Sequence, residues 1–151
     1  MPSTGVSAGA ADRSNAAPRA LSLLSEAVDA RPNIVSIDDD VDGEDARVTV
    51  TLGWAERDWH GQAVGSASQR PRLAGEATLD AVTRFAVNAP RLELLALATT
   101  DLGSARVALA QVRYGSQEIL VGSAIQGEVD DRLAAARAVM DAINRRLAAV
   151  L

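Results

Sequence analysis

The sequence predicts an α+β domain built from two βββα units, related by a local twofold axis, with the helices packed on one face of the sheet or sheets. Two observations carry this prediction. Segments with β-branched or alternating apolar residues come in threes, and each trio is followed by a segment with helical apolar spacing. Short stretches of letters also repeat in the same order in the two halves. With 151 residues, the chain is long enough for one domain with its own core.

The first unit is placed at residues 31–89. Its expected strands are residues 33–37, 47–54 and 59–66, of which the second alternates between apolar and polar side chains. An acidic turn is expected at residues 38–45 around Gly43, because Asp and Gly favour turn conformations. Residues 72–87 carry apolar side chains four residues apart and predict a helix.

The second unit is placed at residues 90–151. Its expected strands are residues 91–99, 105–114 and 117–125, and its helix is expected at residues 131–149 with Asp130 as the N-cap. Ahead of both units, residues 1–18 are poor in large apolar side chains and predict a disordered tail. Residues 19–30 have apolar side chains at helical spacing, which predicts a short amphipathic helix.

The internal repeat is visible in three collinear matches. Ala46-Arg47-Val48 recurs as Ala105-Arg106-Val107, Val64-Gly65-Ser66-Ala67 as Val121-Gly122-Ser123-Ala124, and Ala77-Thr78-Leu79-Asp80-Ala81-Val82 as Ala138-Val139-Met140-Asp141-Ala142-Ile143. Because the order is kept, the matches support a duplicated unit. They place Gly65 and Gly122 at equivalent steps, each where a third strand is followed by its helix.

Composition excludes several classes of function. The net charge is −5, every basic residue is Arg, and phosphate binding needs a basic face, so we expect no nucleic acid and no membrane as partners. There is no Cys, which excludes disulfides and thiolate metal sites and favours a cytoplasmic location. The N-terminus has no basic flank followed by an apolar run, so we expect no signal peptide.

The motif Asp38-x-Asp40-x-Asp42-Gly43 matches the first half of a calcium-binding EF-hand loop. The twelfth position should be Glu and is Thr49, so we expect an acidic turn rather than a metal site.

His60 is the only histidine and lacks a nucleophile with suitable spacing. Asp80 and Asp141 each precede an Arg by four residues, as in surface ion pairs. We therefore expect no catalytic residues, no metal and no cofactor, and predict that the protein is not an enzyme.

Val121-Gly122-Ser123-Ala124-Ile125, followed by an Ala-rich helix ending in Met140-Asp141-Ala142-Ile143-Asn144-Arg145, resembles the end of the C-terminal regulatory domain of alpha-isopropylmalate synthase. The resemblance implies a stand-alone, non-catalytic regulatory domain of two βββα units that forms a homodimer. It also implies binding of a small amino-acid-like ligand, since that family binds leucine between the third strand and the helix of each unit. The residues expected to bind this ligand are Gly65, Ser66, Ala67, Gly122, Ser123 and Ala124.

Two alternatives remain open at this point. The fold could serve only to pair with another protein, without a ligand. The order αβββα from Arg72 onwards is also that of a double-stranded-RNA-binding domain, although Glu128, Asp130 and Asp131 stand where that module needs basic residues.

Overall fold

The computed structural model describes residues 31–151, so the tail expected at residues 1–18 and the helix expected at residues 19–30 lie outside the described part. Its elements are β1 (Asn33–Asp42), β2 (Asp45–Trp54), β3 (Arg57–Ser66), the short 3-10 helix η1 (Ala67–Gln69), α2 (Arg70–Phe85), β4 (Leu92–Leu102), β5 (Ala105–Tyr114), β6 (Glu118–Ile125) and α3 (Asp131–Leu147). The order βββα therefore occurs twice, which confirms the predicted α+β class.

The strands form two separate antiparallel sheets, β1-β2-β3 and β4-β5-β6, with β2 and β5 in the centre. The first strand of each sheet carries a bulge at a matching place. It falls between Ile34 and Ser36 in β1 and between Leu94 and Ala96 in β4. This shared irregularity supports the internal repeat at the level of backbone register.

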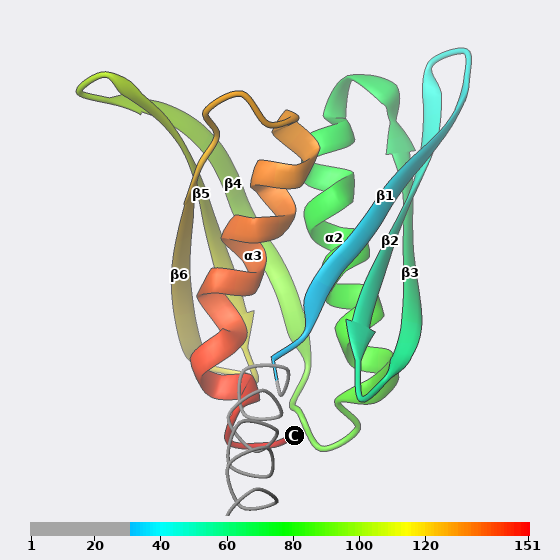
Figure 1. Cartoon of the computed structure of the whole chain (residues 1–151), viewed down its shortest axis with the longest axis vertical. Coiled ribbons are helices and arrows are strands. Elements are labelled where there is room, and N and C mark those ends of the chain that lie inside the picture. The colour runs from blue at the N-terminus through cyan, green and yellow to red at the C-terminus, as the bar shows by residue number, and fades with distance from the viewer. Residues whose placement is uncertain (1–30) are drawn as a thin grey trace, which may run out of the picture. The chain divides into compact units, whose positions relative to one another are not determined.

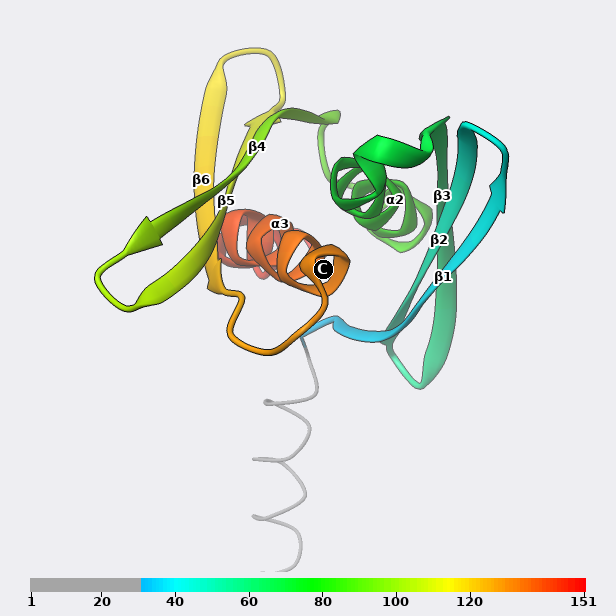
Figure 2. The ribbon, with the colours of Figure 1, turned by 90° about the horizontal axis from the view of Figure 1, so that it is seen from above.

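Residues 32–151 form three layers, with both helices enclosed between the two sheets (Figure 2). Helix α2 packs on β2 and β3, helix α3 packs on β5 and β6, and the two helices contact each other. The helices run in the same direction, so their N-terminal ends lie at the same end of the domain (Figure 1). Each sheet consequently keeps one face against a helix and turns the other face outward.

The core follows from the predicted alternation. Val48, Val50 and Leu52 of β2 point inward and are fully buried, while the residues between them face outward. On α3, Val139 and Ile143 are also fully buried. Much of the remaining helix surface is Ala: the buried alanines of α3 are Ala134, Ala135, Ala136, Ala138 and Ala142. These short side chains let the helix lie close to its sheet.

The hairpins differ from prediction in where they turn. The acidic turn expected around Gly43 is confirmed in position, but its extent of residues 38–45 is wrong, because β1 continues through Asp42 and only Gly43 and Glu44 connect the strands. Gly43 has φ +63°, a left-handed conformation that glycine adopts without strain. The next hairpin turns at Ala55 and Glu56, with φ values of 55° and 61°. Non-glycine residues there strain the backbone.

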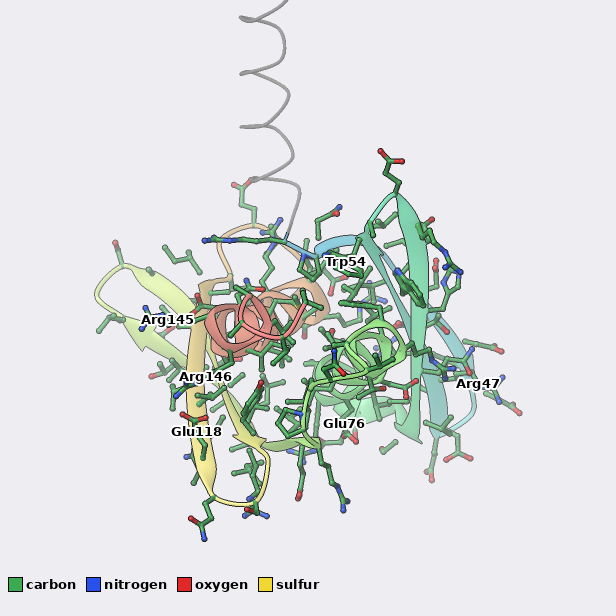
Figure 3. The ribbon with its side chains drawn as sticks, turned by 90° about the horizontal axis from the view of Figure 1, so that it is seen from below. Arg47, Trp54, Glu76, Glu118, Arg145 and Arg146 are labelled. Carbon is green, nitrogen blue, oxygen red and sulfur yellow. The ribbon has the colours of Figure 1, made fainter. Side chains whose placement is uncertain are left out.

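Helix α2 begins at Arg70, two residues before the predicted start, because Pro71 is compatible with a first helical turn. Its last turn places Phe85 against Trp54 of β2, with the rings stacked and their centroids 5.1 Å apart. At the corresponding end of α3, Arg146 forms an ion pair with Glu118 of β6, and Figure 3 shows the two side chains close together. Both contacts fasten the C-terminal end of a helix to its own sheet.

Candidate functional site

The two Gly-Ser-Ala segments do not occupy equivalent places. Gly65 and Ser66 end β3, and Ala67 begins η1, where its backbone N–H donates to the Glu44 carbonyl at 2.8 Å. Gly122 lies inside β6, pairs with Ala110, and is separated from α3 by the rest of the strand and a connecting loop. The predicted equivalence of Gly65 and Gly122 is therefore wrong.

The true counterpart of Gly122 is Gly61. A Cβ atom at Gly122 would lie 2.2 Å from the carbonyl oxygen of Ala138, and one at Gly61 would lie 2.1 Å from that of Ala77. Both glycines thus let a helix backbone pass directly over a strand. Gly65 differs, since a Cβ there would meet the mobile end of the Leu73 side chain at 2.9 Å.

Asp80 and Asp141 also occupy equivalent positions, and both bind the backbone of the adjacent strand. The carboxylate of Asp80 accepts from the Gln62 backbone N–H at 2.9 Å, and that of Asp141 accepts from Ser123 at 2.9 Å. These carboxylates tie each helix to its third strand. Asp80 additionally pairs with Arg84 at 3.3 Å, as the sequence suggested.

Residues from both units meet at the N-terminal ends of the helices. A cavity of about 400 Å³ is lined there by Ala67, Ser68, Arg70, Pro71, Asp130, Asp131 and Arg132. The carboxylate of Asp39, on β1, lies 3.7 Å from the Arg70 guanidinium and 2.6 Å from that of Arg132. The Asp39 side chain is only 11% exposed, so a carboxylate of the protein itself already lies between the two arginines.

The Asp130 carboxylate is bound to Arg132 and caps α3. Its side chain accepts from the Arg132 backbone N–H at 2.7 Å, which confirms the predicted N-cap. The side-chain hydrogen bond from Arg132 holds the pKa of Asp130 well below its usual range, against an opposing desolvation effect. The same contact, together with the bond to Asp39, raises the pKa of Arg132 above its ordinary value.

A cavity of about 630 Å³ forms a groove between β1 and α3 that the sequence did not suggest. Its lining combines apolar and polar side chains, with Ile34, Ile37, Leu133 and Met140 beside Arg132, Arg137, Asp141 and Asn144. Arg137 is exposed and forms no ion pair with any described residue. The Oδ1 atom of Asn144 is buried without a hydrogen-bond partner among residues 31–151.

The matching groove in the first unit, between β4 and α2, is smaller, at about 420 Å³. There Arg72 donates to the Leu94 carbonyl of the edge strand at 3.0 Å and pairs with Glu76 at 3.3 Å. The number of residues that separates Asp80 from Asp141 also separates Arg72 from Leu133 and Glu76 from Arg137, so these pairs occupy equivalent positions in the two helices. The second unit therefore lacks the arginine that fills this groove in the first.

The remaining candidates are the acidic residues of β1 and His60, and each of them pairs with residues of a neighbouring strand. Asp38, Asp40 and Asp42 lie on β1 opposite Thr49, Arg47 and Asp45, and no cluster of metal-binding side chains occurs within residues 31–151. The His60 Nδ1 atom is hydrogen bonded to Thr51 Oγ1 at 2.9 Å across two neighbouring strands.

No protein-family model matches the chain, and no curated protein is similar to it. Among the described helices, neither α2 nor α3 has the length and apolar character needed to cross a bilayer.

The groove between β1 and α3 was not predicted from the sequence. The repeat shows itself in residues that the two halves share, whereas this groove depends on positions where they differ. An alignment of the α2 and α3 sequences that matches Asp80 with Asp141 puts Arg137 at the position of Glu76 and Asn144 at that of Thr83.

Proposed function

We propose that this chain is a non-catalytic regulatory module of the cytoplasm that binds a small amino-acid-like ligand in the groove between β1 and α3. The observation that carries the proposal is the difference between the two grooves. The one along α2 contains Arg72, whose guanidinium is bound to the edge strand, while the one along α3 is larger and presents Arg137, which forms no ion pair within residues 31–151. A volume of about 630 Å³ also lies in the range of small-molecule sites.

The lining suits a zwitterion with an apolar side chain. Arg137, Asp141 and Asn144 are spaced by four and three residues, so they lie along one face of α3. A guanidinium binds a carboxylate in a planar, bidentate manner. The Asp141 carboxylate oxygen that is not bound to the Ser123 backbone, and the Asn144 Oδ1 atom, would accept hydrogen bonds from an ammonium group one or two helical turns further along.

The apolar part of such a ligand would contact Ile37, Leu133 and Met140, which line the same groove. Methionine adapts to irregular shapes, which favours a branched or flexible aliphatic group. The resemblance to the regulatory domain of alpha-isopropylmalate synthase agrees with this ligand class. The location differs from the one that the resemblance implies, because Asp39 already supplies a carboxylate near the helix N-terminal ends.

Binding can be tested by measuring the melting temperature with each of the twenty amino acids at millimolar concentration, followed by calorimetry on those that stabilise. Arg137→Ala should weaken binding roughly 10- to 100-fold, since a hydrogen bond to a charged group contributes about 1.5–3 kcal/mol. Arg145→Ala is the matched control, because it removes another exposed arginine of α3 that lies outside the groove. If no amino acid stabilises the protein, or if both variants behave alike, the proposal is wrong.

A second candidate is a protein-interaction module without a ligand. It is favoured by the exposed aliphatic side chains Ile119, Val121 and Ile125 on β6. Under this reading Arg137→Ala would leave every binding activity unchanged.

A further inference from the structure

The groove between β1 and α3 runs along an unpaired edge of the first sheet. Within residues 31–151, β1 pairs with β2 alone, so its other edge has no partner strand. The groove is lined by the six consecutive residues from Pro32 to Ile37. Successive side chains of a strand point to opposite faces of the sheet, so a cavity that touches all of these residues follows the edge of the strand. Alternate residues of such an edge direct their main-chain N–H and C=O groups away from the sheet.

One main-chain acceptor of this edge lacks the partner that its counterpart has in the other groove. The matching bulges of β1 and β4 make Ile34 equivalent to Leu94. In the other groove, the Leu94 carbonyl accepts a hydrogen bond from Arg72 at 3.0 Å. The residue of α3 that corresponds to Arg72 is Leu133, whose side chain has no hydrogen-bond donor. A ligand in the groove can therefore supply the Ile34 carbonyl with the donor that α3 does not offer.

We propose that the ligand of this groove is a short, extended peptide with a free C-terminal carboxylate, which adds a fourth strand to the β1-β2-β3 sheet. Such a peptide keeps the groove and the partner of the carboxylate, Arg137, so its binding rests on the proposed function and narrows the class of ligand. Main-chain hydrogen bonds to an open strand edge give such peptides their affinity, and pockets for alternate side chains give them specificity.

The length of the groove matches a peptide better than a single amino acid. From Pro32 to Ile37 the strand edge is about 17 Å long, at about 3.3 Å per residue. From Leu133 to Asn144 the α3 wall is also about 17 Å long, at about 1.5 Å per residue. A single extended residue spans only about 3.5 Å, so roughly five residues would fill the groove from end to end.

The charges in the groove indicate the direction of the peptide. Strand β1 and helix α3 run in opposite directions (Figure 1), so Arg137 lies nearer the Ile37 end of the groove than Asn144 does. Beyond Ile37, the ion pair between Asp39 and Arg132 joins the two walls. A carboxylate bound by Arg137 would lie beside this joined end, so the peptide would end there and run parallel to β1. The Asn144 Oδ1 atom, which is buried without a hydrogen-bond partner among residues 31–151, would accept from an N–H nearer the start of the peptide.

Affinity selection followed by calorimetry would test the proposal on the full chain. The probe is a pool of acetylated pentapeptides in which each position is Ala, Ser, Leu, Val or Met, and mass spectrometry identifies the peptides that the protein retains. The best of them should bind at least 10-fold more tightly than any free amino acid. Amidation of its C-terminal carboxylate should weaken binding roughly 10-fold or more, and Arg137→Ala should remove this difference.

Methylation of single amide nitrogens in the selected peptide reports on pairing with the strand edge. Only alternate N–H groups of an added strand point to its neighbour. Methylation should therefore weaken binding roughly 10-fold at every second residue and have a smaller effect at the residues between them.

The variant Leu133→Arg tests the site from the side of the protein. The new guanidinium should bind the Ile34 carbonyl as Arg72 binds that of Leu94, and it should weaken peptide binding at least 10-fold. Val121→Arg is the matched control, because it adds the same charge on β6, where the side chain is 67% exposed and lies outside the groove. It should leave peptide binding unchanged, and circular dichroism would verify that both variants fold.

The possible outcomes separate peptide binding from the proposed function. Amino acids that stabilise the chain while no pentapeptide binds more tightly would overturn the peptide proposal and leave the proposed function intact. Peptide binding that ignores both amidation and methylation, or that Leu133→Arg leaves unchanged, would also overturn it. If neither amino acids nor pentapeptides bind, both proposals are wrong.

Discussion

Replacing Gly122 with Ala should strongly destabilise the protein, although the change adds only one methyl group. The new Cβ atom would lie 2.2 Å from the Ala138 carbonyl oxygen, 2.2 Å from the Ala142 backbone nitrogen and 2.7 Å from its Cα atom. All three are backbone atoms of α3, so no side chain can rotate out of the way. The helix would have to move away from β6 by roughly 1 Å to restore ordinary contact distances.

The cost follows from what that movement would separate. The inner side of α3 buries Ala138, Val139, Ala142 and Ile143 against its surroundings. A radial gap of about 0.5–1 Å already removes a quarter to a half of the dispersion energy of a contact. Overpacking typically costs about 1–3 kcal/mol, and a clash with rigid backbone belongs at the upper end, near 3 kcal/mol. For a domain of this size the melting temperature would fall by roughly 10 °C.

Thermal and urea unfolding followed by circular dichroism would measure the effect. Gly61→Ala should behave like Gly122→Ala, because its Cβ atom would meet the backbone of α2 at 2.1 Å. Gly65→Ala is the control, since its neighbour is the end of the flexible Leu73 side chain, and it should cost less than about 1 kcal/mol. Similar losses for Gly122→Ala and Gly65→Ala would refute the reasoning from close helix–strand contact.

Three further outcomes are expected. Glu56→Gly should stabilise the protein by about 1 kcal/mol in urea unfolding, because Glu56 has a φ of 61° that glycine adopts without strain; a destabilised variant would contradict this. Asp130→Ala should cost about 1 kcal/mol through the lost N-cap. Since Arg132 lowers the pKa of Asp130 in the folded state, the stability that this carboxylate contributes is complete above about pH 4, and the difference in unfolding free energy between the variant and the wild type should shrink progressively as the pH falls below about 4. Asp141→Ala should speed amide exchange at Ser123 and leave exchange at Gln62 unchanged, with Asp80→Ala producing the reverse.

Local patterns predicted the fold well where a strand has one buried face. The strand at residues 105–114 has the predicted bounds, because its buried inward residues Ala108, Ala110 and Val112 are apolar and a turn-forming glycine follows it. The sequence failed at Asp38 to Asp42, which form part of β1. The acidic residues suggested a turn, but the pairing with β2 prevails over the low strand propensity of Asp. Asp39 is the inward-facing member of this run and meets Arg132 instead of solvent.

The predicted binding residues show a second limit of prediction from the sequence. The letters Val-Gly-Ser-Ala occur twice, and we aligned them as equivalent, although small residues recur easily in a chain rich in alanine. The offset of four residues between that alignment and the structural one moves Gly65 from a helix contact to the end of a strand. Only contacts between distant segments, such as Gly61 with Ala77, reveal the correct register.

The two units share some positions and differ at others, and this comparison bears on function. The positions that join helix to strand are the same in both: glycine at 61 and 122, alanine at 77 and 138, and aspartate at 80 and 141. Their close contacts admit almost no other side chain. Two positions that differ in chemistry lie in the groove along α3, where Leu133 and Arg137 correspond to Arg72 and Glu76 of α2.

Packing alone does not require either difference. Arginine at position 72 closes one groove without disturbing the core, so an arginine at Leu133 would be compatible with the fold on the other side. The proposed ligand binding accounts for the larger groove along α3, whereas packing of the core does not require it.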